Sequence, residues 1–226
     1  IRLLCAIYGC WYRGAVPVPV RAGSEHFGTF KVVAQESKAC FAMVSSKKVY
    51  SQIVEAIPYL QLVEVENPSK MESLTNTSLA RIPYCPPTLE LQCLLDFTVT
   101  NVGSLVGRQF TWKNILRLSQ SLKDQTEVYP GRELDIAVDP IQGFGLFTLI
   151  SLPVHSGCSL VWHKTLEIEK NVAEWIKNTI PHARDVFVGA ALAKKIQWVQ
   201  QKNISTAKLS NVRSFNGNRQ SANVRS

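Results

Sequence analysis

Short apolar runs broken by proline and glycine fill the chain from Ala15 to about Trp112, and they restrict what its first half can fold into. Each run is rich in Val, Ile, Phe or Tyr, the residues that favour strands. Such runs at turn-punctuated spacing are typical of antiparallel sandwiches and barrels. They read TFKVVAQ, ACFAMVS, KVYSQIVEAI, LQLVEVE and LQCLLDFTVTNV. Pro17 and Pro19 each remove a backbone donor, so we expect a sheet edge or an extended arm there.

The second half has a mixed pattern. A helix is predicted from Lys113, because Ile115, Leu118 and Leu122 recur at helical spacing. Strands are predicted at ELDIAVD and GFGLFTLISLPV, and two further helices at EIEKNVAEWIKNTI and RDVFVGAALAKKIQWVQQ. Helical spacing also predicts that one set of side chains packs against a neighbour: Val172, Trp175, Ile176, Val186, Ala190, Ala193 and Trp198.

Together these patterns predict a mainly β fold, an antiparallel sandwich or barrel with a few helices in the second half and a disordered basic tail; its jelly-roll-like form is what the family resemblance given below implies. The predicted parts are a β-rich jelly-roll-like region at 1–112, a mixed α/β region at 113–201 and a flexible basic tail at 202–226. With 226 residues, 46% of them hydrophobic, the chain is long and apolar enough to bury a sizeable core. No stretch approaches the roughly 20 apolar residues of a membrane-spanning helix.

The predicted tail holds much of the formal net charge of +8. It contains no acidic residue, and it is rich in Ser and Asn, so burial cannot offset the entropy of ordering it. Its cations could contact RNA or a neighbouring subunit, or they could form a solvated terminus. The cations are Lys202, Lys208, Arg213, Arg219 and Arg225.

Catalytic and metal-binding signatures are incomplete in this sequence. The six cysteines form no C-x-x-C pair, so buried free thiols are favoured over disulfides or a metal site. The four histidines are far apart, and no nucleophile elbow or H-E-x-x-H pattern occurs. Gly143 and Gly145 suggest a glycine-rich nucleotide loop, but Phe147, Thr148 and Ile150 predict a continuing strand rather than a helix. We therefore expect no enzyme activity, no cofactor and no metal.

Two segments resemble the SET-domain lysine methyltransferases. Gly143, Gly145, Leu146 and Phe147 match the family's opening strand, and Asn216 and Asn223 match the ends of its cofactor segment. Gly217, Asn218 and Arg219 replace the His, Ser and Cys of that segment. The resemblance implies at most a degenerate methyltransferase.

The opening of the chain resembles the jelly-roll capsid proteins of picorna-like viruses. The apolar segment Ile1–Tyr8 leads to Trp11, Tyr12, Arg13 and Gly14, similar to the family's helix-to-strand corner. Further on, VEAIPYLQLVEVENP and LLDFTVTNVGSLVGRQFTW resemble later barrel strands. In that corner, Trp11 would cap the barrel end, Gly14 would let the backbone turn and Arg13 would bind loop carbonyls. Any β-sandwich could also carry such an aromatic corner.

The capsid resemblance implies a structural viral protein. Its expected function is self-assembly into an icosahedral shell that encloses RNA, with other capsid subunits as partners, RNA on the tail and no membrane. Its expected locations are the virion and the host cytoplasm. The alternatives are an accessory subunit of a cellular ribonucleoprotein assembly and the degenerate methyltransferase.

Overall fold

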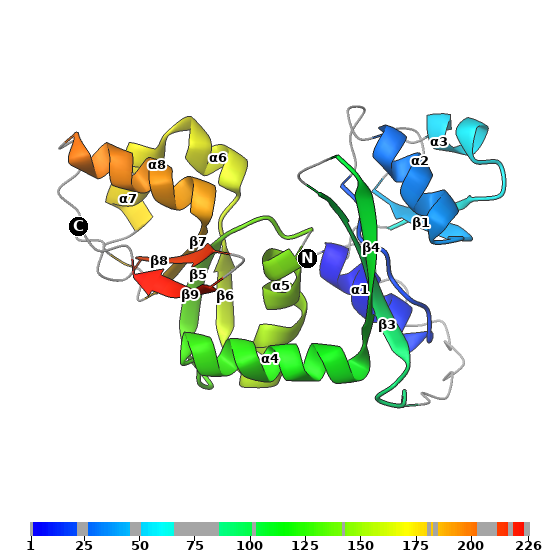
Figure 1. Cartoon of the computed structure of the whole chain (residues 1–226), viewed down its shortest axis with the longest axis horizontal. Coiled ribbons are helices and arrows are strands. Elements are labelled where there is room, and N and C mark those ends of the chain that lie inside the picture. Colours follow the sequence, from blue (N-terminus) through cyan, green and yellow to red (C-terminus); the bar gives the residue numbers. More distant parts are fainter. Residues whose placement is uncertain are drawn as a thin grey trace, which may run out of the picture. The chain divides into compact units, whose positions relative to one another are not determined.

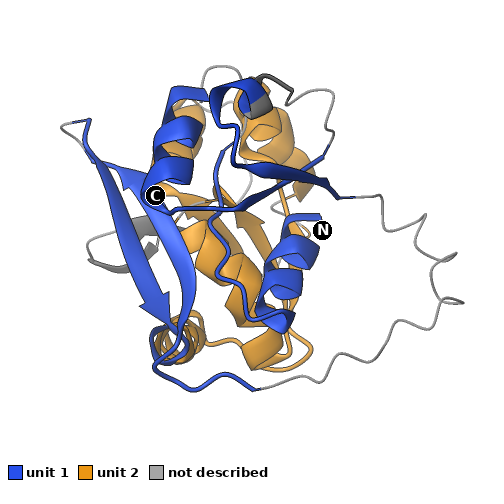
Figure 2. Cartoon of the chain, turned by 90° about the vertical axis from the view of Figure 1, so that its right-hand side faces the viewer, with its two compact units in different colours: residues 1–114 blue, residues 115–226 orange. Residues whose placement is uncertain are grey.

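A computed structural model gives the fold of the chain and divides it into two compact units, Ile1–Asn114 and Ile115–Ser226 (Figures 1 and 2). Among the described residues, no helix is both long and apolar enough to cross a membrane. The structure describes residues 2–21, 27–45, 51–65, 86–100, 103–141, 143–179, 182, 185–202, 212–216 and 219–223.

The first unit contains an antiparallel hairpin formed by β3 (Gln92–Val99) and β4 (Leu105–Thr111). The unit opens with α1 (Arg2–Tyr12), which places Trp11 beside the hairpin. The indole Nε1 of Trp11 donates to the Cys93 carbonyl oxygen at 2.6 Å, and its ring lies 4.9 Å from that of Trp112. A partly buried aromatic contact and one hydrogen bond therefore fasten α1 to the hairpin.

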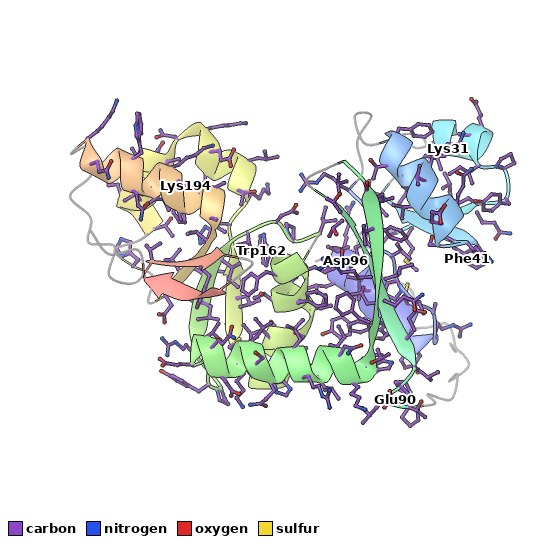
Figure 3. All side chains as sticks on the ribbon, in the orientation of Figure 1. Lys31, Phe41, Glu90, Asp96, Trp162 and Lys194 are labelled. Carbon is purple, nitrogen blue, oxygen red and sulfur yellow. The ribbon has the colours of Figure 1, made fainter. Side chains whose placement is uncertain are left out.

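The same unit has a separate parallel pair, β1 (Phe41–Val44) and β2 (Gln61–Glu64). Helices α2 (Phe27–Glu36) and α3 (Ser51–Ala56) accompany it, and its buried cluster consists of Ala34, Ile53, Ile57 and Leu60. Successive side chains of a strand point to opposite faces. Ala42 and Leu62 pack on this cluster, whereas Phe41 and Met43 are exposed, so only one face of the pair is covered. Phe41 is labelled in Figure 3.

The second unit is built on a five-stranded sheet with the order β6-β5-β7-β8-β9. The first four strands are parallel and β9 is antiparallel to β8. The strands are β5 (Glu133–Ala137), β6 (Ser159–Trp162), β7 (Val186–Gly189), β8 (Val212–Asn216) and β9 (Arg219–Asn223). From β5 the chain moves outward to β6, then returns past β5 to β7. This reversal is the topological switch point of a doubly wound α/β sheet.

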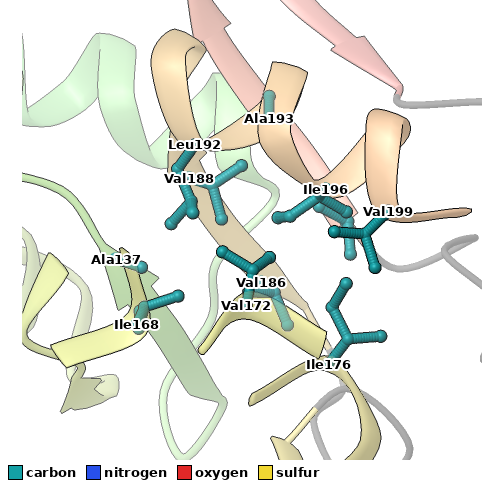
Figure 4. Close-up of a cluster of buried hydrophobic side chains, with 11 residues drawn as sticks. Ala137, Ile168, Val172, Ile176, Val186, Val188, Leu192, Ala193, Ile196 and Val199 are labelled. Carbon is teal, nitrogen blue, oxygen red and sulfur yellow. The ribbon is translucent and has the colours of Figure 1, made fainter. Parts of the chain in front are cut away.

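Helices cover both faces of this sheet (Figure 1). On one side lie α6 (Thr165–Lys170), α7 (Val172–Thr179) and α8 (Ala190–Gln201), and on the other lie α4 (Trp112–Thr126) and α5 (Gly143–Ser156). Right-handed crossovers place α5 opposite α6, α7 and α8, because the chain moves from β5 to β6 in one direction and from β6 to β7 and β8 in the other. The first side encloses an apolar core of Ala137, Ile168, Val172, Ile176, Val186, Val188, Leu192, Ala193, Ile196, Val199 and Val212 (Figure 4).

The prediction of a mainly β, jelly-roll-like sandwich is wrong. Two runs expected to be strands lie mostly in helices, TFKVVAQ in α2 and GFGLFTLISLPV in α5. A third, KVYSQIVEAI, contains α3. The sheet of the second unit is largely parallel, which a jelly roll never is. Helix α5 is buried on most sides, so its sequence lacks the amphipathic period that would have revealed a helix.

Two further boundaries differ from the expectation. The helix predicted at EIEKNVAEWIKNTI is two helices, α6 and α7, separated at Asn171. The helix predicted at RDVFVGAALAKKIQWVQQ begins as β7 and becomes α8 only at Ala190. Of the side chains expected to pack, Trp198 is exposed. Residues 15–20 contain no strand, but the Pro17 carbonyl accepts a hydrogen bond from Leu95 of β3, as an extended edge segment can.

Candidate functional site

The carboxyl ends of β5 and β7 meet at the switch point of the sheet, where open α/β folds bind their ligands. The connection from β5 to α5 starts at Val138 and Asp139. The connection from β7 is immediate, since α8 begins at Ala190 directly after Gly189. A Cβ added at Gly189 would lie 4.0 Å from Cγ1 of Val138, so the two connections are neighbours.

Asp139 and Gly145 fix the shape of the connection between β5 and α5. The Asp139 carboxylate accepts a hydrogen bond from the Ile141 amide at 3.1 Å, as in an Asx turn. A Cβ on Gly145 would lie 1.8 Å from the Asp139 carbonyl oxygen, a distance no real side chain allows. Only glycine therefore lets the first turn of α5 pack this closely on the end of β5.

Two helix N-termini open at this switch point, those of α5 and α8. Neither helix has an acidic residue in its first turn. Backbone N–H groups at a helix N-terminus carry partial positive charge and favour anions such as phosphate. The connections themselves contain no Lys or Arg from Val138 to Gly145 or from Gly189 to Ala193. Within these two connections, therefore, the groups that could hold an anion are backbone groups.

A buried carboxylate, an imidazole and an indole form a line beside the switch point. Asp135 of β5 lies 2.6 Å from Nε2 of His163, the residue that follows β6. On the other side of the ring, Nε1 of Trp175 in α7 donates to Nδ1 of His163 at 3.5 Å. The three side chains connect the sheet to a covering helix.

At the opposite, amino end of the strands, Arg132 and the buried Asp185 form a partly buried ion pair. Arg132 Nε donates to the Asp185 carboxylate at 3.0 Å, and Nη2 donates to the same oxygen. The hydrogen bond with Asp185 is the main reason that the pKa of Arg132 is raised. Because this pair lies away from the carboxyl edge, we interpret it as structural.

The turn between β3 and β4 in the first unit is rich in hydroxyl groups, but the amides of its described residues Gly103 and Ser104 are occupied. Gly103 N–H donates to the Thr100 carbonyl, and Ser104 N–H donates to Thr100 Oγ1 at 3.1 Å. Nearby, burial raises the pKa of the Cys93 thiol to about 12, so this cysteine is not a nucleophile at neutral pH. The described part of this hairpin therefore offers no obvious chemistry.

The predicted structural corner lies at the end of α1. Gly14 has a φ of +69° and follows the helix, so it is the left-handed residue that ends α1 rather than a barrel corner. Arg13 is exposed, whereas Trp11 is partly buried against the hairpin. The proposed importance of Trp11, Arg13 and Gly14 stays a prediction.

The five predicted contact cations are scattered. Lys202 follows α8, with its ammonium 4.1 Å from the ring centroid of Trp198. Arg213 lies in β8 and Arg219 in β9, and the structure describes their backbone only. Lys208 and Arg225 are outside the described residues. Contact between these residues and a partner stays a prediction.

The described histidines, cysteines and carboxylates form no group of three that could hold a metal ion. The described cysteines are free thiols, of which Cys93 and Cys158 are buried while Cys5 and Cys40 are exposed. The expectation that the thiols are buried is therefore only partly right. Cys85 lies outside the described residues.

Sequence reasoning missed Asp135, His163 and Gly189. A usable signal was present at Glu133–Gly145, where an apolar run ends in Asp-Pro and a Gly-x-Gly sequence follows. That order fits a strand, a turn and a helix start. The glycines were instead interpreted as a turn within a sheet, because the residues after them are β-branched or aromatic.

No family model matches the chain. It is 31% identical over 184 residues to Disco-interacting protein 2 homolog A of Mus musculus, which covers 78% of this chain and 12% of that protein. It is 29% identical over 195 residues to homolog B of the same species, and 26% identical over 217 residues to Disco-interacting protein 2 of Drosophila melanogaster. The chain spans 12% of the length of each of these relatives.

Solved structures with a similar fold are adenylate-forming enzymes. The McyG A-PCP structure with phenylalanyl-adenylate has a TM-score of 0.73 at 13% identity. The match covers 92% of this chain and 33% of the McyG chain. The fatty acyl-adenylate ligase from L. pneumophila has a TM-score of 0.72 at 14% identity, covering 97% and 38%. ATP-bound MatB from Rhodopseudomonas palustris has a TM-score of 0.68 at 14% identity, covering 86% and 38%.

These similarities overturn the capsid interpretation. The relatives are cellular proteins of animals, so the expected virion location, the capsid partners and the RNA-enclosing shell are all wrong. The expectation of a non-enzymatic protein also fails, because the proteins that share the fold are ligases. The ribonucleoprotein and methyltransferase alternatives fit neither finding. The chain has the α/β fold of part of an adenylate-forming ligase.

Proposed function

We propose that this chain is part of an adenylate-forming domain, and that the carboxyl edge at β5 and β7 helps to bind ATP or an acyl adenylate. The observation that supports this most is the switch point with two helix N-termini, found in a fold whose solved examples hold phenylalanyl-adenylate, acyl adenylate or ATP. Ligands of doubly wound sheets bind at such a point.

The chemistry of adenylation suits such an edge. A carboxylate oxygen attacks the α-phosphorus of ATP, the bond from that phosphorus to the bridging oxygen breaks, and pyrophosphate leaves. Negative charge on the phosphate oxygens is stabilised by N–H groups that are already in place before the reaction. The N-termini of α5 and α8 would supply such groups, while Gly145 and Gly189 keep side chains out of the space beside them.

The proposed contribution of the two connections is positioning rather than charge neutralisation. They carry no cation between Val138 and Gly145 or between Gly189 and Ala193. Backbone groups at a helix N-terminus contribute typically about 0.3–1 kcal/mol per charge. Binding by this edge alone should therefore be modest, and it should favour nucleotides that carry several phosphate charges.

Calorimetric titrations of the chain with three separate ligands test the proposal: Mg-ATP, AMP and a non-hydrolysable acyl-adenylate analogue. The informative variant is Ala191→Glu, which places a carboxylate in the exposed first turn of α8. An acid there favours the helix but repels phosphate, so stability should hold or rise while ATP binding weakens about two- to five-fold.

The matched control is Gln197→Glu, which adds the same charge on an exposed position two turns further along α8. Its affinity for ATP should equal that of the unchanged chain, because the helix dipole acts within one turn of its end. Failure of all three probes to bind at millimolar concentration would contradict the proposal. If both variants weakened ATP binding equally, the binding site would not be at the N-terminus of α8.

A further inference from the structure

The line of Asp135, His163 and Trp175 joins three elements of the second unit. Asp135 belongs to β5 and is 7% exposed, so its carboxylate needs a partner inside the protein. His163 follows β6, and its own amide donates to the Ile136 carbonyl at 2.8 Å, which extends the ladder between β5 and β6. Trp175 belongs to α7 and is partly buried against the apolar core. The imidazole is thus held between the sheet and a helix.

The hydrogen-bond partners indicate which nitrogen carries the hydrogen when the ring is neutral. An indole N–H can only donate, so Nδ1 of His163 must accept the bond from Trp175 and carries no hydrogen. The hydrogen of a neutral ring then lies on Nε2, where it donates to the Asp135 carboxylate at 2.6 Å. The indole edge meets the imidazole ring at 77°, with 5.6 Å between ring centroids, which fits this donation. Both ring nitrogens are used only in the neutral Nε2–H tautomer.

The charged groups around this ring have partners of their own. From β5 the ring faces Asp135. On α6 and the residue before it, Lys164 and Glu167 form an exposed ion pair at 2.8 Å. On α7, Glu174 is exposed and accepts a hydrogen bond from Asn171. Arg132 and Asp185 pair with each other at the amino end of β5 and β7. Among the described residues, the carboxylate of Asp135 makes the ion-pair contact with His163.

We propose that Asp135, His163 and Trp175 form a proton-sensitive latch that fastens α7 to the sheet while His163 is neutral. Protonation of His163 adds a hydrogen to Nδ1, so both ring nitrogens become donors. The contact with Asp135 then becomes a charge pair and persists. The indole N–H of Trp175 faces another donor and loses its acceptor. Protonation of His163 therefore releases the polar anchor at this end of α7.

The latch does not depend on the proposed nucleotide site. Release would leave Val172 and Ile176 buried, so α7 stays folded on the sheet but loses its polar anchor. Local opening of this kind occurs below the free energy of global unfolding. Amides of Val172–Thr179 should therefore lose protection from hydrogen exchange at pH 5.5 relative to pH 7.5, after correction for intrinsic rates, while amides of Ala190–Gln201 should not.

The test uses the whole chain with its histidines labelled with nitrogen-15. At pH 7.5 the ring of His163, assigned by the loss of its signals in His163→Gln, should show a protonated Nε2 and an unprotonated Nδ1. Between pH 8 and 5 the tryptophan fluorescence should change in one transition that follows the titration of this ring, because Trp175 loses its hydrogen bond to Nδ1.

Two variants should abolish that transition, His163→Gln and Trp175→Phe, which removes the indole N–H but keeps a ring. Two matched controls should keep it: His155→Gln, whose imidazole pairs with Gln120 in an exposed contact, and Trp198→Phe, whose indole is exposed. A protonated Nδ1 or a charged ring at pH 7.5 overturns the proposal, as does a fluorescence transition that survives in Trp175→Phe. The nitrogen measurement on the unchanged chain decides the matter even if a variant fails to fold.

Discussion

The two units bury their strands in different ways. In the second unit β5 and β7 are covered on both faces, and their residues are almost continuously buried. In the first unit β1 and β2 form a two-stranded pair with one covered face, and Phe41, Met43 and Val63 remain exposed. A sheet covered on both faces leaves little room for a side chain to move. Changes in the second unit should therefore cost more than equivalent changes in the first.

The largest effect is expected from Gly145→Ala in the second unit. The added Cβ would lie 1.8 Å from the Asp139 carbonyl oxygen, which belongs to the backbone and cannot rotate away. The free energy of unfolding should fall by about 3 kcal/mol or more, at the upper end for overpacking. Urea unfolding followed by circular dichroism measures it. A loss under about 1 kcal/mol would show that the β5–α5 connection adapts easily.

Gly28→Ala is the matching change in the first unit. Gly28 lies within α2, and apart from the helix's own backbone and the adjacent residues, no atom of the described residues lies within 4 Å of its added Cβ. Alanine in a helix is favoured over glycine by roughly 0.5–1 kcal/mol, so this variant should be slightly more stable. Destabilisation by both variants to a similar degree would break the proposed difference between the units.

A second comparison contrasts two ion pairs. Arg132→Met in the second unit leaves the Asp185 carboxylate 5% exposed and without its guanidinium, which should cost about 3 kcal/mol. Lys113→Met in the first unit removes an exposed pair with Glu90 and should cost well under about 1 kcal/mol. Thermal unfolding at pH 7 gives both values, and equal losses would mean that burial does not separate the two pairs.

The fold was partly predictable from the sequence. Strands lie where β-branched and apolar runs predicted them at Phe41–Val44, Gln92–Val99 and Glu133–Ala137, and α4 follows the spacing of Ile115, Leu118 and Leu122. In each of these segments the residues that favour the element locally also have the spacing that matches its buried side. The parallel order of the sheet could not be predicted, because it depends on crossovers whose helices were themselves mistaken for strands.

Helix α5 shows why those helices were missed. Eight of its residues are buried, including Leu146, Ile150 and Leu152, so the helix is apolar almost all round. A short apolar run of this kind is compatible with a buried strand or a buried helix, and periodicity cannot separate them. At Trp198 the helix was predicted correctly but the burial was not. Its helical spacing predicted a packed side chain, whereas the side chain is 54% exposed.

The candidate site could not be found by motif. Asp135 and His163 are separated by 28 positions, and they meet because β5 and β6 pair in parallel. The register pairs Ile136 with Trp162, which brings the next residue, His163, to the end of β5. The aromatic corner around Trp11, by contrast, is a local pattern that many folds share. A resemblance based on it therefore pointed to the wrong family.

A third comparison removes equal volumes from two cores. Ile176 and Ile57 are both almost fully buried, the first among the helices and strands of the second unit and the second in the small cluster beside β1 and β2. Replacement by alanine should cost about 3 kcal/mol at Ile176 and about 2 kcal/mol at Ile57, because a cluster with one open side can collapse into the cavity. Urea unfolding of the two variants measures the difference, and a larger loss at Ile57 would reverse the comparison.

A smaller effect than those of the two core isoleucines is expected at Trp11, where α1 is fastened to the hairpin of the first unit. Trp11→Phe removes the Nε1 donor to the Cys93 carbonyl but keeps an aromatic ring beside Trp112. The β3 backbone loses one hydrogen bond in a half-buried site, so the variant should be about 1 kcal/mol less stable. Arg13→Ala serves as the control, since Arg13 is exposed and should change the unfolding free energy by less than about 0.5 kcal/mol. If Trp11→Phe instead cost as much as Ile176→Ala, the anchoring of α1 would depend on this single bond. The first unit would then be as intolerant of change as the second.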